Sequence, residues 1–353
     1  MHAFSNATDG SMIMARVSDL GIDLGTSNVL IYQKGVGIVL RQPAVVAIER
    51  TSKKVVAVGT EAYRMIGRTP GNLLTVRPLR QGAVHDLELT NTMLRYFMNS
   101  ILGRRFFARP RVVLSVPSGV GETDKSSLVS ILYDTGVQRT QLLERPIAAA
   151  MGARVDFSKP YGCMIVDMGA GATDIAVLAA GQVMHSNCIS CGGDAFDGAI
   201  ISYLRKKHNL LIGERTAEEI KIAIGSAVPP PTDLTCEVTG RNLLMGLPKT
   251  QTIHASEIYE ALKAPVETLI EAIRSVLEQT PAQLASDVFE DGITLTGGAA
   301  ALTGLSEAIY NALHTHCVLA EDPQTSIVLG CGMALENYST YRSLLRDSRR
   351  NLH

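Results

Sequence analysis

Two aspartates have the clearest chemical potential in this chain, because each lies where an apolar strand ends in a turn of small residues. Asp23 lies in LGIDLGTSNV (residues 20–29), and Asp167 lies in MIVDMGAGATDIAV (residues 164–177). A buried carboxylate is costly unless a cation meets it. The turns that follow offer backbone N–H groups to an anion. A phosphate with its metal ion would satisfy both requirements, although an ordinary hairpin would explain either segment taken alone.

The two segments repeat one design. Aligning Asp23 with Asp167 also aligns Gly25 with Gly169, and an apolar strand returns after each turn. Such an internal repeat predicts two similar half-molecules that face each other across a cleft. A nucleotide held between the two turns would receive N–H donors from both sides, and the two carboxylates could hold a hydrated Mg²⁺ against its phosphates. We therefore interpret the pair as a nucleotide site.

Two later segments could complete the site. In GERTAEEIK (residues 213–221), Thr216 is predicted to cap a helix with Glu219 three residues on. Glu218 and Lys221 share one side of that helix and could contact ribose or adenine, although their spacing alone favours a solvent-exposed face. LTGGAAALTGL (residues 295–305) predicts a strand, a Gly-Gly turn and a helix. Such a turn lets backbone approach a flat ring or a phosphate, and a plain strand–helix connection explains it equally well.

Composition excludes several classes of protein. The 353 residues contain 46% hydrophobic and 19% charged residues, which predicts two or three folded domains. A net charge of −1 disfavours nucleic-acid binding. Six unpaired-looking cysteines, no signal peptide and no apolar run long enough to span a bilayer favour a cytoplasmic location, with surface attachment left open. The Cys188 and Cys191 pair has no partners with zinc-ligand spacing and does not open a thioredoxin-like helix.

The pattern along the chain alternates strands and helices. Strands are expected at 45–49, 55–58 and 112–116, and helices at 89–102 and 121–136, which indicates an α/β protein. Ser256 is predicted to cap a long helix that Pro265 should bend or divide. We expect residues 1–18 to be a flexible segment, with Met14 as an alternative start, and residues 338–353 to be a solvated basic tail.

Five ordered blocks carry a resemblance to a known family. They are LGIDLGTSNVLIY, LLERPIAAAMGA, MIVDMGAGATDIAV, GGDAFDGAI with GERTAEEIKIAIGSA, and LTGGAAALTGL with AEDPQTSIVLGCGMALE. As a set they resemble the actin superfamily of ATP-binding proteins, and more closely the MreB family of bacterial actin homologues. The resemblance implies an actin-like α/β fold with two similar mixed-sheet domains, in four subdomains, around a nucleotide cleft. The implied domains are 19–160, with a small subdomain inserted at about 44–86, and 161–337, with one at about 200–262.

Carried over by position, the resemblance implies a site that holds ATP and Mg²⁺. Asp23 and Asp167 are expected as catalytic residues and as the Mg²⁺ ligands, through water. The implied nucleotide-binding residues are Gly25, Thr26, Ser27, Asn28, Gly169, Ala170, Gly171, Gly193, Asp194, Glu218, Lys221, Gly297, Gly298, Ala299 and Ala300.

The sequence departs from the family at Arg145. Family members usually have an acidic residue there, thought to position the attacking water, and Glu144 is retained one place earlier. An arginine cannot accept a proton, so Arg145 could stabilise transition-state charge or hold the γ-phosphate in a tight ground state. Glu144 is no automatic substitute, because successive residues face different ways. With Glu144 and Arg145 as the further catalytic candidates, we expect at most a slow or conditional ATPase.

The segment RRFFARP (residues 104–110) suggests a membrane contact. One phenylalanine in the core and one covering it would explain the pair Phe106 and Phe107. The alternative is a loop that inserts both rings into a membrane while arginines meet anionic headgroups. MreB relatives carry an apolar loop at this point, which favours the membrane contact.

The resemblance implies a function in the cytoskeleton. It implies a cytoplasmic, ATP-switched protein peripheral to the inner face of the cell membrane, which forms filaments and organises cell-wall elongation and cell shape. The implied partners are its own copies, the membrane surface and membrane proteins of the peptidoglycan elongation machinery, without nucleic acid. A filament that positions plasmids or organelles is an alternative, and a small-molecule kinase of the same fold is a weaker one. A chaperone ATPase would need a further substrate domain and lid, which we do not expect here.

Overall fold

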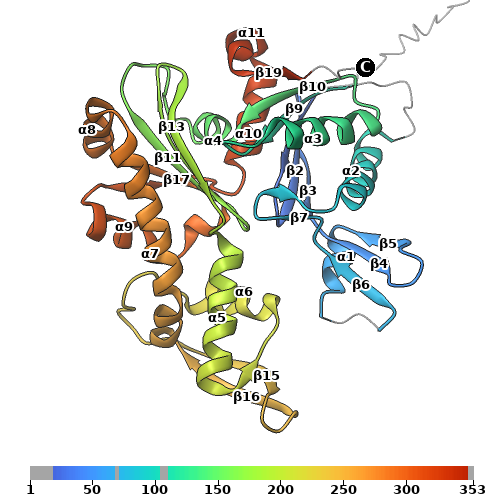
Figure 1. Ribbon diagram of the computed structural model, residues 1–353, viewed down its shortest axis with the longest axis vertical. Coiled ribbons are helices and arrows are strands. Elements are labelled where there is room, and N and C mark those ends of the chain that lie inside the picture. Colours follow the sequence, from blue (N-terminus) through green and yellow to red (C-terminus); the bar gives the residue numbers. More distant parts are fainter. Residues whose placement is uncertain (1–18, 68–70, 104–109, 349–353) are drawn as a thin grey trace, which may run out of the picture.

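Two β-sheets organise the protein, whose computed structural model describes residues 19–67, 71–103 and 110–348. Five strands of the first sheet correspond in order to the five strands of the second, and β19 is an additional edge strand of the first. Figure 1 shows the first sheet on the right and the second on the left. The first has the order β19-β10-β9-β1-β2-β3 and the second the order β13-β12-β11-β17-β18. The strands of the first are β1 (Leu20–Leu24), β2 (Asn28–Gln33), β3 (Gly37–Pro43), β9 (Arg111–Val116), β10 (Arg139–Glu144) and β19 (Arg346–Ser348). Those of the second are β11 (Cys163–Met168), β12 (Thr173–Ala179), β13 (Gln182–Ile189), β17 (Ile293–Thr296) and β18 (Cys317–Leu319).

The two sheets also share their strand directions. β1 pairs antiparallel with β2 and parallel with β9, and β11 pairs in the same way with β12 and β17. β10 and β18 extend the sheets in parallel on the far side. The predicted α/β fold with two similar mixed sheets is therefore confirmed, and β1 and β11, which carry the repeated aspartates, occupy equivalent central positions.

Amphipathic helices cover the sheets. In α7 the apolar residues Ile258, Leu262, Val266, Leu269 and Ile273 recur every three or four positions and are buried in the core of the second half. Fully burying one such side chain stabilises the fold by about 1.5–3 kcal/mol. The covering helices are α2 (Leu87–Leu102) and α3 (Glu122–Asp134) in the first half, and α7 (Ala255–Gln279), α8 (Ala282–Asp291) and α9 (Leu305–Leu313) in the second. α5 (Gly193–His208) packs against α7 and leads away from the second sheet toward the small subdomain.

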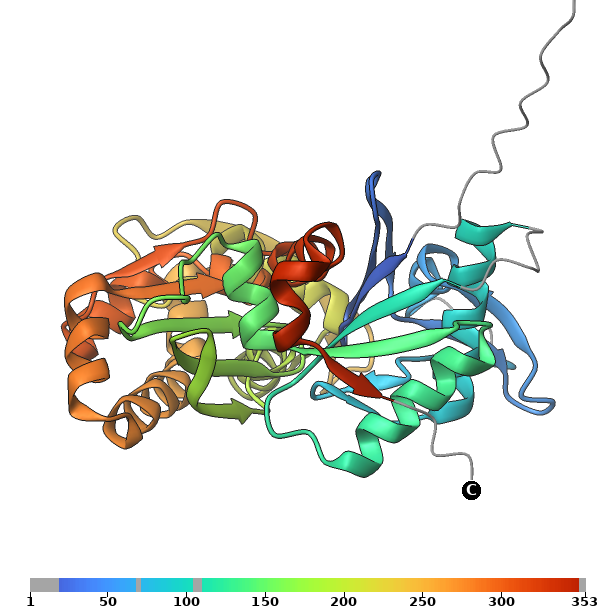
Figure 2. The same ribbon diagram turned by 90° about the horizontal axis from the view of Figure 1, so that it is seen from above.

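One helix from each half meets the other between the sheets. α4 (Arg145–Gly152) follows β10 and α10 (Ser326–Glu336) follows the second sheet, and Figure 2 shows the pair between the two halves. Their backbones touch, because a Cβ on Gly152 would lie 1.8 Å from the Ser326 oxygen and one on Gly330 would lie 1.9 Å from the Ala148 oxygen. Glycine at both positions lets the helices pack at the separation seen here.

Two small sheets extend from the halves. They lie within the segments where we expect inserted subdomains, at the lower right and at the bottom of Figure 1. The first contains β4 (Val46–Glu49), β5 (Val55–Val58) and β6 (Leu73–Val76), beside α1 (Thr60–Arg64). The second contains β14 (Leu210–Leu211), β15 (Thr235–Asn242) and β16 (Pro248–His254), beside α6 (Glu214–Ile224). A two-stranded ribbon of β7 (Leu79–Arg80) and β8 (Ala83–Val84) leads back toward the first sheet.

Two predicted helix caps are wrong. α6 begins at Glu214 after Gly213, so Thr216 lies inside its first turn. α7 begins after His254, whose N–H donates to Glu257 Oε2 at 3.0 Å, so Ser256 is also inside its helix. Pro265 does not divide α7, because the residues before and after it bury the same face.

The prediction of a solvated basic tail is wrong for residues 338–348. α11 (Tyr338–Tyr341) and a 3₁₀ turn, η2 (Arg342–Leu344), lead into β19, which pairs antiparallel with β10. Leu345 is buried, Asp347 forms an ion pair with Arg139, and Arg346 lies 2.9 Å from Glu144. Polar residues therefore complete an edge of the first sheet. Residues 1–18 and 349–353, together with Phe106 and Phe107, lie outside the described residues. Within the described ranges, no helix combines the length and apolarity needed to cross a bilayer.

Gly330→Ala should lower the free energy of unfolding by about 2 kcal/mol or more, because the new methyl group would overlap the Ala148 oxygen. Gly198→Ala in α5 is the matched control, because no heavy atom lies within 4 Å of its Cβ position. There alanine should stabilise the helix by up to about 1 kcal/mol. Chemical denaturation followed by circular dichroism measures both, and equal stability of the two variants would contradict the close packing of α4 and α10.

Candidate nucleotide site

The turns after β1 and β11 are closed by equivalent hydrogen bonds. The Gly25 N–H donates to the Asn28 oxygen at 3.0 Å, and the Gly169 N–H donates to the Ala172 oxygen at 2.9 Å. Each turn therefore places two small residues at its tip, at residues 26–27 and 170–171. The repeat found in the sequence is thus a repeat of backbone geometry.

The two aspartates receive equivalent hydroxyl hydrogen bonds. Ser115 Oγ donates to Asp23 Oδ1 at 3.0 Å, and Thr296 Oγ1 donates to Asp167 Oδ1 at 2.9 Å. Ser115 lies on β9 and Thr296 on β17, the strands that pair in parallel with β1 and β11. Sequence reasoning missed these hydroxyls, although a search for polar residues at the ends of the neighbouring strands would have found them.

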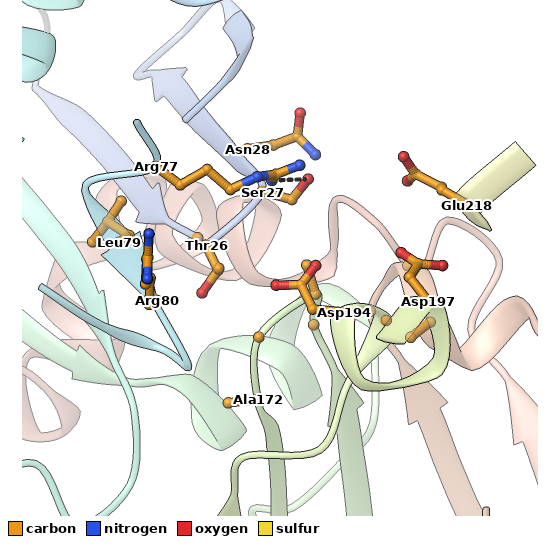
Figure 3. A pocket seen from close by; sticks show the side chains of 18 of the residues that line it. Thr26, Ser27, Asn28, Arg77, Leu79, Arg80, Ala172, Asp194, Asp197 and Glu218 are labelled. Carbon is orange, nitrogen blue, oxygen red and sulfur yellow. Dashed lines mark hydrogen bonds between the residues drawn. The ribbon is translucent and has the colours of Figure 1, made fainter. Parts of the chain in front are cut away.

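A cavity of about 1340 Å³ lies between the halves and contains both turns. Figure 3 shows Thr26, Ser27 and Asn28 on one side of it and Asp194 and Glu218 on the other. The residues predicted from the sequence that line it are Asp23, Gly25, Thr26, Ser27, Asn28, Arg145, Asp167, Gly169, Ala170, Gly171, Gly193, Asp194, Glu218, Lys221, Gly297, Gly298 and Ala299.

Two predicted site residues lie elsewhere. Ala300 is not among the residues that line the cavity and is buried in the core of the second half, because the 3₁₀ turn after Gly297 points it inward. Glu144 is also outside the lining, and its Oε1 lies 2.9 Å from Arg346 Nη2. It ends β10 while Arg145 begins α4, so the two side chains diverge. A catalytic role for Glu144 has no geometric support in this arrangement.

Several lining residues were missed. Arg77 follows β6 and Arg80 ends β7, and Arg77 Nη1 donates to Ser27 Oγ at 3.5 Å (Figure 3). Only the tertiary fold brings them to the first turn. Asp197 lies one helical turn after Gly193 in α5 and pairs with Lys221 at 2.8 Å. Burial raises the pKa of Asp197 to about 6, although Lys221 lowers it.

Contacts join the halves across the cavity. Thr26 Oγ1 accepts a hydrogen bond from the Gly82 N–H of its own half at 3.1 Å. Gly171 of the second half approaches the same oxygen, from which a Cβ on Gly171 would lie only 2.6 Å away. Glycine at 171 therefore permits the two turns to touch. Tyr63 Oη, on α1, donates to Glu218 Oε2 on α6 at 3.4 Å. Arg41 of β3 likewise donates to Gln324 in the loop before α10.

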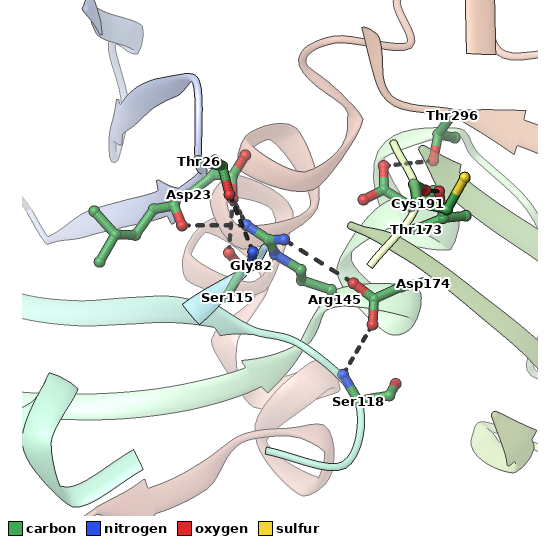
Figure 4. Close-up of polar contacts among 12 residues, drawn as sticks. Asp23, Thr26, Gly82, Ser115, Ser118, Arg145, Thr173, Asp174, Cys191 and Thr296 are labelled. Atoms are coloured by element: carbon green, nitrogen blue, oxygen red, sulfur yellow. Dashed lines mark hydrogen bonds and ion pairs between the residues drawn. The ribbon is translucent and has the colours of Figure 1, made fainter. Parts of the chain in front are cut away.

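Arg145 lies at the centre of a buried polar network (Figure 4). Its Nη2 donates to Asp23 Oδ1 and to the Leu24 oxygen, both at 3.2 Å, and its Nη1 lies 4.0 Å from Asp174 Oδ2. The Ser118 N–H donates to the other carboxylate oxygen of Asp174 at 3.0 Å. Burial alone would lower the pKa of Arg145, but the negative charges of Asp23, Asp174 and Asp167 have the larger combined effect, and the pKa is raised above its ordinary value. A charged guanidinium therefore links the two sheets.

Asp167 is suited to meet a further cation. Burial raises its pKa to about 7, with Asp174 and Asp23 adding to the rise and Arg145 opposing it. The described residues contain no cluster of three or more His, Cys, Asp or Glu side chains placed to hold a metal. Mg²⁺ commonly uses one or two carboxylates together with phosphates and water. Asp167 fits such a role, whereas the Asp23 carboxylate already meets Arg145.

Comparisons with known proteins agree with this arrangement. A model of the MreB/Mbl protein family matches residues 17–343. The chain is 43% identical over 319 residues to the cell shape-determining protein Mbl of Bacillus cereus, covering 90% of this chain and 96% of the relative. It is 43% identical over 324 residues to the cell shape-determining protein MreB of Escherichia coli, covering 90% and 93%.

Solved structures share the fold. MreB5 of Spiroplasma citri bound to ADP superimposes with a TM-score of 0.88 at 30% identity, covering 94% of this chain and 98% of that one. A MamK double helical filament gives a TM-score of 0.75 at 20% identity, covering 90% and 98%. The predicted actin-like fold is confirmed.

Asp167→Asn should flatten the pH dependence of stability between about pH 4 and pH 7. The folded protein keeps the Asp167 proton up to about pH 7, whereas the unfolded chain releases it near the ordinary aspartate pKa of 3.8. The free energy of unfolding of the wild type therefore falls as the pH rises through this window, by at most about 1.4 kcal/mol per pH unit from this group. Asparagine keeps an acceptor for Thr296 and removes the titration.

Urea denaturation without nucleotide, at pH values from 5 to 8, measures the difference between the two proteins. Asp291→Asn, at an exposed carboxyl at the end of α8, is the control and should follow the wild-type curve. Parallel curves for wild type and Asp167→Asn would show that this carboxyl does not hold its proton.

Proposed function

The chain belongs to the MreB/Mbl protein family, and we propose that it is an ATP-binding, actin-like cytoskeletal protein that forms membrane-associated filaments and organises cell-wall elongation and cell shape. The observation that carries the nucleotide part is the pair of equivalent turns that face one cavity, each with a buried aspartate at its base. The cell-shape part rests on the named functions of the relatives.

The lining residues suit the parts of a nucleotide. Backbone N–H groups of the two turns and the hydroxyls of Thr26 and Ser27 would bind phosphate oxygens, with Arg77 beside Ser27. Glu218 would accept hydrogen bonds from ribose hydroxyls in place of the one from Tyr63. The backbone at 297–299 would lie against adenine. A Mg²⁺ ion that entered with the nucleotide would lie beside Asp167. The MreB5 protein of Spiroplasma citri, solved with ADP and with AMPPNP, supports this assignment.

Nucleotide would act as a switch through the contacts that cross the cavity. The close approach of Gly171 to Thr26, the ion pair of Arg145 with Asp174 and the Tyr63–Glu218 contact all depend on how closely the halves approach. A ligand that touches both turns would favour the closed arrangement by its differential affinity for it. The closed shape would then be the one that packs end to end.

An apolar hairpin tip supports self-association. Leu244, Met245 and Leu247, between β15 and β16, are 78%, 72% and 60% exposed, at the lower extreme of the molecule in Figure 1. Adjacent exposed apolar side chains of this kind mark protein contacts more often than isolated ones do. We propose that this tip, residues 243–247, contacts the next copy in a filament. The membrane contact at Phe106 and Phe107 rests on the sequence.

Purified protein with ATP should form filaments on vesicles that contain anionic lipid, as seen by electron microscopy. The double variant Phe106→Ser, Phe107→Ser should keep filaments in solution and lose them from vesicles, because the apolar insertion is removed. The double variant Leu244→Ser, Met245→Ser should lose filaments in both settings.

Val36→Ser is the control for that experiment, because Val36 is 68% exposed on a turn of the first half, away from the hairpin tip. It should behave as wild type. Absence of ATP-dependent filaments from the wild type, with and without lipid, would overturn the cytoskeletal assignment. Filaments that never associate with vesicles would instead favour a filament that positions cargo.

Arg145→Glu should raise ATP turnover at saturating ATP by at least about tenfold, because a carboxylate can orient and deprotonate water whereas a guanidinium cannot. Phosphate release measures the rate, and circular dichroism checks that the variant folds. Arg145→Lys keeps the charge and should stay slow. A wild-type rate equal to that of relatives with an acidic residue here, or a folded, ATP-binding Arg145→Glu variant without any increase, would contradict a slow ATPase.

A further inference from the structure

The guanidinium of Arg145 lies directly behind the first turn. Its Nη2 donates to the Leu24 oxygen at 3.2 Å and would lie 4.0 Å from a Cβ on Gly25. Arg145 is 5% exposed, begins α4 and is among the residues that line the cavity. An anion held by residues 25–28 would therefore have a fixed positive charge behind the backbone that binds it.

Two other cations that line the cavity are engaged differently. Lys221 pairs with Asp197 and donates to the Gly193 oxygen at 3.2 Å, and Arg77 reaches Ser27 on the rim of the turn. Arg145 forms an ion pair with Asp23 and also lies near Asp174, which belongs to the second sheet. It thus faces the carboxylates of both halves.

The first aspartate is a poor place for a divalent cation in this chain. Asp23 Oδ1 already accepts hydrogen bonds from Ser115 and from Arg145. A metal ion that shared this carboxylate would be close to the guanidinium, and two like charges at such range repel strongly in a buried site. The guanidinium is held in place by carboxylates on two sheets and does not deprotonate at physiological pH.

We propose that Arg145 supplies, beside Asp23, the positive charge that a divalent cation would otherwise bring, so that this chain binds nucleoside di- and triphosphates with little dependence on Mg²⁺. The inference rests on the proposed nucleotide site and concerns how its charge is balanced. A fixed internal cation needs no ordering when nucleotide arrives, whereas a metal ion must first exchange water.

The affinity for ATP and for ADP, measured by calorimetry in excess EDTA and in excess MgCl₂, tests the proposal. The two wild-type dissociation constants should agree within about threefold, a difference of under about 0.7 kcal/mol. Arg145→Gln should bind at least about tenfold more weakly in EDTA than in MgCl₂, because the metal must then replace the missing charge. Arg145→Lys is the matched control and should keep the weak Mg²⁺ dependence, because it keeps the charge.

The outcomes separate this inference from the proposed function. A wild type that binds in MgCl₂ and loses about tenfold or more in EDTA would overturn the inference and leave the nucleotide site intact. A folded Arg145→Gln variant whose dissociation constants in EDTA and in MgCl₂ have the same ratio as in the wild type would overturn it as well. Arg145 would then only join the two halves and would not balance the charge of the nucleotide. Absence of binding in both conditions would overturn the nucleotide site itself. If Arg145→Gln fails to fold, the ratio of the wild-type dissociation constants in EDTA and in MgCl₂ still tests the inference.

Discussion

A buried guanidinium between carboxylates of two different sheets is the interaction on which the centre of this molecule depends. Removing such charges from water is expensive, and the expense is offset only when each charge is closely paired and hydrogen-bonded. Arg145 meets Asp23 and the Leu24 oxygen in one half and approaches Asp174 in the other. The Ser118 N–H holds the remaining side of Asp174. The halves are therefore joined electrostatically at the point where a ligand would enter between them.

The duplicated architecture explains why this point exists. β1 and β11 both end at the cavity, and each is followed by a turn closed by an equivalent backbone hydrogen bond. Asp23 and Asp167 accept equivalent hydrogen bonds from the hydroxyls of Ser115 and Thr296. The two copies differ in the side chains around their aspartates and not in their backbone geometry. Asp23 has a guanidinium beside it, whereas Asp167 is buried with a raised pKa. One aspartate is already paired with a fixed cation, whereas the other is buried and accepts a hydroxyl hydrogen bond from Thr296.

Rigid and adjustable contacts between the halves lie side by side. α4 and α10 touch backbone to backbone at Gly152 and Gly330, which leaves little freedom for sliding. The contacts at the cavity are single hydrogen bonds and ion pairs, such as the one from Tyr63 to Glu218, which a ligand can replace at small cost. The two halves are therefore packed most tightly at the glycine pair and are joined at the cavity by individual polar contacts.

The sequence alone determined the repeated strand–turn design, because small residues after an apolar strand restrict the local backbone whatever surrounds it. It also indicated the two-sheet fold, the family and most of the residues that line the cavity. Tertiary structure decided the rest. Arg77 reaches the first turn through the inserted sheet, and Ala300 turns into the core. Glu144 pairs with Arg346 of a C-terminal strand whose edge pairing no local pattern foretold. Local composition does not encode contacts between residues two hundred positions apart, because these depend on how the sheets are placed in space.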